Sequence, residues 1–268
     1  MPEIRVIADS ARAGAGLMPV SEPRRAWLPQ HARFCPVIED GSRMGLLVYP
    51  PLFEGESYQV AYIDDGHYEL TFFRARQPVF TFASKPSGGG GGTGLSELVR
   101  FDEHGGVPRE EVAKLAASLV INLHTPIGGV GLRGSHDFAT PEGWDTIYSG
   151  VLNDVRRPAT PPLTVRVETD WFRQPTEFRY VLQKGDSISA EAHTPVGQVT
   201  FVSREEVTLT LASDEEAVQF ELERREYWAR KPEYERYTAY GSPNDRQYQQ
   251  ERRGRRAAAS EAGATAED

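Results

Sequence analysis

The segment from Thr146 to Val207 constrains the fold of this chain more than any other stretch. Short runs of alternating apolar and polar residues are separated there by polar stops at Gly150–Asp154, Thr169–Trp171 and Thr194–Val199. Alternation with a period of two residues is typical of half-buried strands, and glycine, proline, asparagine and aspartate favour turns between them. The segment therefore predicts a barrel-like β domain.

The composition agrees with a strand-rich globular protein. The 25 glycines and 19 prolines favour many turns over a helical bundle, and 39% hydrophobic and 26% charged residues are ordinary values. A net charge of −9 argues against general nucleic-acid binding, which needs a basic surface. A homo-oligomer is compatible with a strand-rich fold, because exposed strand edges can pair.

Membrane insertion and cysteine chemistry are not expected. No apolar run approaches the roughly 20 residues that a membrane helix needs. The single cysteine, Cys35, gives neither an internal disulfide nor a zinc cluster, and its apolar neighbours favour a small buried side chain over a reactive thiol. The first residues lack the apolar core of a signal peptide, so we expect a cytoplasmic protein.

A series of strands is predicted from Arg24 to Phe82. The run 45–49 ends at two prolines, which cannot donate to a strand ladder. The runs 58–63 and 68–73 flank Asp64-Asp65-Gly66, a sequence typical of a hairpin turn. Residues 79–82 form one more short strand in this interpretation.

Two helices are also predicted. Pro108-Arg109-Glu110-Glu111 resembles a helix start, with proline in the first turn and acidic groups near the positive end of the helix dipole. The β-branched residues from 119 to 123 then favour a strand. The second helix starts at Ser213, where Glu216 completes a capping box, and extends to about residue 230.

These patterns divide the chain into four parts. We expect a weakly ordered lead (1–23), a β domain (24–211), a C-terminal helix with an extension (212–239) and a disordered tail (240–268). Five successive glycines predict a flexible loop at 86–94; the lysine and serine or threonine of a phosphate-binding loop do not follow them at the required spacing.

Several short motifs between Trp27 and Val207 resemble a sparsely described family of bacterial and tailed-phage proteins of unknown function. They are Trp27, Cys35-Pro36, the glycine-led strand at 45–48, Thr125-Pro126-Ile127-Gly128, Gly150–Asp154 and Thr194–Val199. The motifs span about two thirds of the chain. This resemblance implies no established activity.

A more distant likeness is to the dUTPase and dCTP-deaminase superfamily. Gly150–Asp154 is similar to the step that forms part of its nucleoside pocket, and Val196–Val199 is similar to its closing strand. Arg133-Gly134-Ser135 stands where the family has its phosphate-binding turn, and the family's glycine-rich carboxy-terminal lid has no counterpart. The likeness implies a β-clip type of fold and makes Asp154 a candidate pocket residue. The predicted fold class is thus mainly β, a barrel-like or β-clip type domain with one inserted helix and a C-terminal helix.

The densest polar cluster is Arg133-Gly134-Ser135-His136-Asp137. Arginine can grip a carboxylate or phosphate, and histidine can act as a base near neutral pH. The cluster is either a ligand-binding loop or an ordinary solvated turn.

Asp170 and Trp171 form a second candidate, because an exposed tryptophan beside an acid can stack on a planar ligand. A strand-end aromatic more often fills a core, however, and we favour that interpretation for both Trp171 and Trp144.

A metal site is the third candidate. His67 and Glu69 lie two apart on one predicted strand and so share a face. With His124, His136 or His193 as a third ligand they could hold non-haem iron, and His124 is the candidate we retain. The alternative is that both are solvated residues after a turn.

No complete catalytic motif is present, so the leading hypothesis is a small-molecule-binding or accessory module for an anionic or planar ligand. The alternatives are a metal-dependent oxygenase or hydrolase, and a nucleotide-binding dUTPase-like protein without the complete catalytic motif. No cofactor is specified by the sequence.

Overall fold

We describe the fold from a computed structural model, for residues 2–63, 67–86, 96–102, 106–121, 129–156, 161–230, 247–255 and 257. The chain forms two compact units, each built from two stretches. Unit 1 is Met1–Glu22 with Met44–Arg204, and unit 2 is Pro23–Arg43 with Glu205–Asp268. This division differs from the predicted one, because residues 24–43 and 205–211 belong to the second unit.

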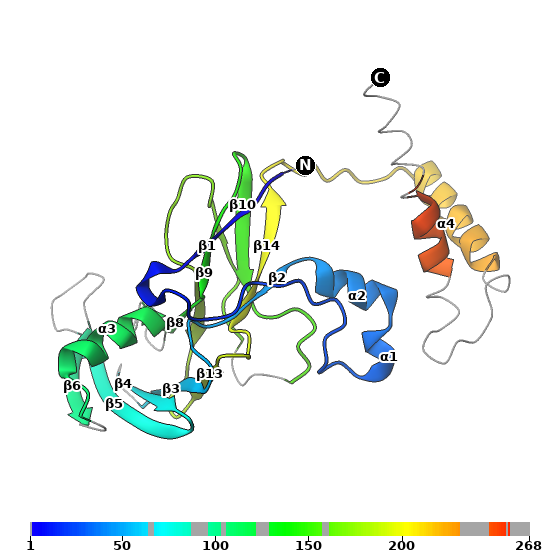
Figure 1. Cartoon of the computed structure of the whole chain (residues 1–268). Helices are drawn as coiled ribbons and strands as arrows, with labels where there is room; N and C mark the ends of the chain where they lie inside the picture. The colour runs from blue at the N-terminus through cyan, green and yellow to red at the C-terminus, as the bar shows by residue number, and fades with distance from the viewer. Residues whose placement is uncertain are drawn as a thin grey trace. The chain divides into compact units, whose positions relative to one another are not determined.

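Unit 1 contains the largest sheet, which has five antiparallel strands (Figure 1). In spatial order they are β13 (Ser187–Glu191), β3 (Glu56–Tyr62), β4 (Tyr68–Arg74), β5 (Gln77–Pro86) and β6 (Ser96–Asp102). Buried residues alternate with more exposed ones along β3 and β4, as the sequence pattern predicts for half-buried strands. Tyr62 pairs with Tyr68 across the predicted hairpin.

The other strands of unit 1 form three smaller antiparallel sheets. One contains, in order, β11 (Val165–Val167), β10 (Trp144–Ser149), β14 (Gly197–Ser203) and β2 (Leu46–Val48). The next contains β12 (Glu177–Val181), β8 (Gly129–Arg133) and β7 (Val120–Ile121), and the last pairs β1 (Arg5–Ala8) with β9 (His136–Ala139). The mainly-β prediction is confirmed, but none of the four sheets closes into a barrel in the described part of the chain.

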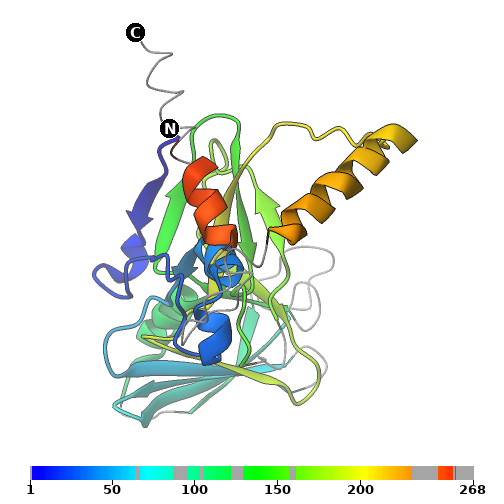
Figure 2. The same cartoon turned by 90° about the vertical axis from the view of Figure 1, so that its right-hand side faces the viewer.

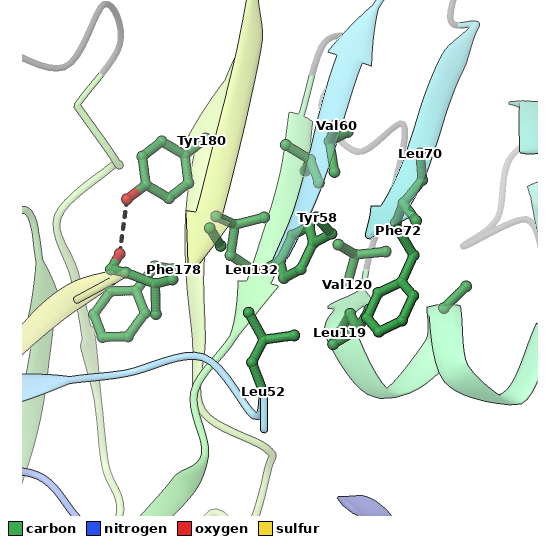
Figure 3. Packing of buried hydrophobic residues seen from close by; sticks show 14 of the residues in the cluster. Leu52, Tyr58, Val60, Leu70, Phe72, Leu119, Val120, Leu132, Phe178 and Tyr180 are labelled. Carbon is green, nitrogen blue, oxygen red and sulfur yellow. Dashed lines mark hydrogen bonds between the residues drawn. The ribbon is translucent and has the colours of Figure 1, made fainter. Parts of the chain in front are cut away.

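A single hydrophobic core joins the sheets of unit 1. Figure 3 shows Tyr58, Phe72, Leu119, Leu132 and Phe178 packed within it, contributed by different strands and by the end of a helix. That helix, α3 (Arg109–Leu119), is the predicted inserted helix, and it buries the apolar positions of one face in the core.

The first residues of the chain, predicted as a weakly ordered lead, form regular elements that contact the rest of unit 1. β1 pairs with β9, and a short 3-10 helix, η1 (Ser10–Arg12), follows it. Arg12 donates to the buried carboxylate of Glu56 at 2.8 Å and to the Pro51 carbonyl at 2.7 Å. The lead was not recognised because its strand partner, β9, is distant in sequence.

In its described part, unit 2 has helices as its regular elements. It contains α1 (Gln30–Arg33), α2 (Pro36–Arg43), α4 (Asp214–Ala229) and a helical stretch at 247–255. The strand pattern predicted to begin at Arg24 was therefore wrong for residues 30–43. The capping box at Ser213 is confirmed, with both reciprocal hydrogen bonds to Glu216 present.

Of the predicted disordered tail, the structure describes residues 247–255 and 257. The helical stretch 247–255 contacts the rest of unit 2: the Gln247 side chain donates to the Tyr227 carbonyl at 2.8 Å, and Arg252 pairs with Asp40. The remainder of the tail and the predicted glycine-rich loop lie almost entirely outside the described residues. In the part of the chain that the structure describes, no helix has the length and apolar character to cross a membrane.

Candidate functional site

The predicted ligand loop at 133–137 connects β8 to β9 and lies against the start of the chain. The Arg133 guanidinium, 13% exposed, donates to Asp9 at 3.0 Å, and the Asp9 backbone N–H donates to the Ser135 carbonyl at 3.0 Å. Asp9 also caps η1 by accepting from the Ala11 N–H at 2.9 Å. Arg133 thus connects the first residues of the chain to the sheets, so its charge has a structural role.

The Ser135 hydroxyl makes two hydrogen bonds. Ser135 is a buried residue, and its hydroxyl lies 3.0 Å from the Leu17 carbonyl and 2.9 Å from Nδ1 of His136. A carbonyl only accepts, so the serine proton points to Leu17, and Nδ1 of His136 must carry the proton that it donates to Ser135. Burial lowers the pKa of His136 from its ordinary value, and the nearby Asp137 carboxylate partly offsets this effect. His136 is therefore a neutral, positioned imidazole near neutral pH.

Asp137 completes the connection between elements. Its carboxylate accepts from the Thr176 N–H at 2.7 Å, and burial raises its pKa, an effect that this hydrogen bond partly offsets. Burial also raises the pKa of Tyr148 to about 12. The side chains of Arg133, Ser135 and Asp137 thus have partners within the chain, and this loop has the contacts of a structural joint.

Asp170 and Trp171 lie in a charged surface region around Arg204. The Arg204 guanidinium pairs with Asp170 and with the buried Asp145, and the Gly143 N–H donates to Asp170 at 3.1 Å. Arg204 is the main cause of a lowered pKa at Asp170. Asp170 is therefore engaged in holding the end of β14 against the turn after β11.

Trp171 is exposed, so the prediction that it fills a core was wrong. Its side chain is 63% exposed, and its ring centroid lies 5.5 Å from that of Phe172, which is 44% exposed. Trp171 follows β11 in a turn, and its indole N–H donates to the side chain of Glu168. Trp144, by contrast, is half-buried in β10.

The predicted metal site is only partly visible. His67 and Glu69 lie at the start of β4, as expected, whereas His124 lies outside the described residues. Where the structure describes the chain, no group of three or more histidine, cysteine, aspartate or glutamate residues is arranged to hold a metal ion.

A pocket of about 320 Å³ lies in unit 1 between the two segments singled out in the sequence. It is lined by Leu132, Gly150, Val151, Asp154, Arg156, Pro161, Pro162, Tyr180, Ile188, Ser189, Thr194, Pro195 and Val196. Of the predicted ligand-binding residues, Asp154 alone is among these described lining residues. The others lie in the joint at 133–137 and in the region around Arg204.

Hydrogen bonds fix the walls of this pocket. The Leu152 N–H donates to the buried Gln198 side chain at 3.1 Å, which ties the turn at 150–154 to β14. The Tyr180 hydroxyl, from β12, donates to the Val196 carbonyl at 2.7 Å (Figure 3). Two walls therefore have defined positions before any ligand binds.

The charged part of the pocket is one ion pair. Arg156 donates to Asp154 through Nε at 2.9 Å and through Nη2 at 2.6 Å, a two-point contact that raises the pKa of Arg156. The Asp154 side chain is 12% exposed and that of Arg156 is 44% exposed. The remaining lining is apolar, proline or hydroxyl-bearing.

Four lining residues were not predicted from the sequence: Arg156, Pro161, Pro162 and Tyr180. The nearest signal was the spacing of Arg156 two residues after Asp154, which allows the side chain to fold back onto the carboxylate. Tyr180 and Ser189 had no signal, because strand alternation does not show which face meets a distant turn.

Comparison with models of known protein families and with curated proteins finds no match.

Proposed function

We propose that this chain is a binding module for a small planar molecule, held in the pocket between the turn at 150–156 and the segment 194–196. The observation that supports this most is the lining itself, in which a single ion pair stands among prolines, aliphatic side chains and Tyr180. A concave, largely apolar site with few polar groups is the usual form of a small-molecule site.

The ion pair favours a planar ligand over a simple anion. Asp154 neutralises Arg156, so the pocket offers one acceptor group and one donor group with no net positive charge. An amide or heteroaromatic edge presents both a donor and an acceptor and matches this pair. The flat faces of Pro161, Pro162 and Pro195 suit a planar body.

A nucleoside is a specific case of such a ligand. Gly150–Asp154 resembles the step that forms part of the nucleoside pocket in the dUTPase superfamily, and Val196–Val199 resembles its closing strand. In this chain Gly150, Asp154 and Val196 line the pocket, which supports the proposal. However, the counterparts of the phosphate-binding turn, Arg133 and Ser135, contact Asp9 and Leu17. Base or nucleoside binding is therefore favoured over nucleotide hydrolysis.

Saturation-transfer NMR and thermal-shift measurements with uracil, uridine, uridine monophosphate, nicotinamide and benzoate test the proposal. We expect binding of at least one neutral planar probe, and weaker binding of benzoate. Arg156→Gln and the pocket-filling Ser189→Trp should each abolish the signal, whereas Arg5→Gln, on the exposed strand β1, should keep it. Absence of binding by every probe, or equal binding by Arg156→Gln and Arg5→Gln, would contradict the proposal.

The binding experiment also distinguishes a module for a planar molecule from the nucleotide-binding alternative, because a nucleotide site would bind uridine monophosphate much more tightly than uridine.

We further propose that the protein is cytoplasmic, as the sequence predicts.

A further inference from the structure

The segment that links β14 to α4, residues 206–212, is the most exposed apolar stretch of unit 2; we call it the arm. Val207, Leu209 and Leu211 are 83%, 92% and 97% exposed. The backbone of the arm makes no hydrogen bond to any other described residue. Figure 2 shows it as an extended trace that leads into α4.

The arm has the sequence of a strand without a partner. In Val207-Thr208-Leu209-Thr210-Leu211, apolar residues alternate with threonine, so an extended backbone places the apolar side chains on one face and the threonines on the other. Exposed apolar side chains beside unpaired N–H and C=O groups are typical of a surface that pairs with another strand.

The alternation of apolar residues and threonines is symmetric about Leu209, so the arm matches a reversed copy of itself. We propose that the arm pairs with the arm of a second copy of this chain, antiparallel, about a two-fold axis at Leu209. Leu209 then lies opposite Leu209 of the second copy, and Val207 lies opposite Leu211. Moving the register by one residue would place apolar residues opposite threonines and lose the common face.

The charges at the ends of the arm favour the same arrangement. In this register Glu206 lies opposite Ala212 of the second copy and Glu205 lies opposite Ser213, so no two acidic residues face each other. A parallel pair in register would instead place Glu205, Glu206 and Asp214 beside the same residues of the second copy, where like charges repel.

A hollow beside the arm adds apolar cover. Leu211, Ala217 and Phe220 line a space of about 510 Å³ between the arm and the first turns of α4. Phe220 is 66% exposed, and Val207 of the second copy would lie next to it. This contact matters because two paired strands without other packing are only marginally stable.

Sedimentation equilibrium of the full chain over a range of concentrations tests the pairing. We expect a monomer–dimer equilibrium that Leu209→Lys weakens at least about tenfold. Thr208→Lys adds the same charge on the opposite face of the same strand and should have a much smaller effect. A monomer at every concentration, or equal effects of the two lysine variants, would overturn the proposal.

Cysteine cross-linking tests the register. In a Cys35→Ser background, Leu209→Cys places two thiols opposite each other with Cα atoms about 5 Å apart, which a disulfide can span. Val207→Cys places them about 13 Å apart, which it cannot. Rapid disulfide-linked dimers are therefore expected for Leu209→Cys only, and equal cross-linking of both variants would overturn the two-fold arrangement.

Discussion

The two hydrogen bonds of the Ser135 hydroxyl fix the protonated nitrogen of His136. Because Nδ1 donates to Ser135, Nε2 of the neutral ring is left as an acceptor. Sequence reasoning identified this cluster as chemically dense but could not identify its partners, since Asp9, Leu17 and Thr176 come from distant parts of the chain. The polar side chains of this cluster form hydrogen bonds that hold these segments together.

The lowered pKa of His136 predicts a dependence of stability on pH. The unfolded chain binds a proton at about the ordinary value of 6.5, whereas the folded chain binds it only at lower pH. The contribution of His136 is therefore complete above that value and is lost as the pH falls through the window below it. Denaturant unfolding at about pH 7.5 and about pH 5.5 should show a smaller loss on acidification for His136→Gln than for the native chain.

Asp137 is common to both proteins. Its raised pKa acts in the opposite direction, because it makes the folded chain bind protons more readily. An unaltered pH dependence in His136→Gln would contradict the assignment.

Gly197 is a core position that tolerates no side chain. A Cβ atom there would lie 2.0 Å from the ring of Phe178. Gly197→Ala should lower the free energy of unfolding by roughly 3 kcal/mol. Gly254→Ala is the matched control: nothing lies within 4 Å of its Cβ position, so the substitution should be neutral or slightly stabilising in that helix.

The elements that local sequence specifies were the ones predicted. A capping box gave α4, the acidic first turn after a proline gave α3, and a hairpin turn flanked by alternating runs gave β3 and β4. Local patterns were insufficient for short elements. α1 has only four residues, and its neighbour α2 begins at a proline within an apolar run, so their helical period is too brief to recognise.

The candidate pocket was only half predictable for a related reason. The turn at 150–154 and the segment 194–199 were visible as motifs, and the structure brings them together. The remaining wall comes from β12 and β13, whose contribution depends on how the sheets pack. How the sheets pack depends on contacts between residues that are distant in sequence. The alternation of apolar and polar residues along a strand does not specify these contacts.

The hairpin turn between β4 and β5 is strained. Ala75 and Arg76 have φ values of 49° and 65°, a region that suits asparagine and glycine. The double substitution Ala75→Asn with Arg76→Gly should raise the free energy of unfolding by about 1 kcal/mol, measured by urea denaturation. Ala75→Asn alone should give a smaller gain, and a loss of stability in the double variant would contradict a turn of this type.

The chain passes from one unit to the other at residues 22–23, 43–44 and 204–205. The last crossing leads directly into the arm, whose backbone has no hydrogen bonds to other described residues. Backbone that is extended, exposed and unpaired is the preferred substrate of proteases.

Limited digestion of a dilute sample with thermolysin, which cleaves before large apolar residues, should therefore cut before Val207, Leu209 or Leu211 ahead of sites in the β strands of unit 1. Mass spectrometry of the first fragments identifies the cut. Resistance of the arm while the strands at 129–203 are cleaved would contradict its description as an unpaired segment.

The composition of unit 2 from two distant stretches has a consequence for synthesis. Residues 23–43 are synthesised before unit 1 is complete, whereas α4 and the helical stretch at 247–255 are synthesised after it. The side chain of Asp40 therefore meets Arg252 only after residues 44–204 have been made. Until then α2 lacks the helical stretch that it contacts, so unit 1 can assemble before unit 2.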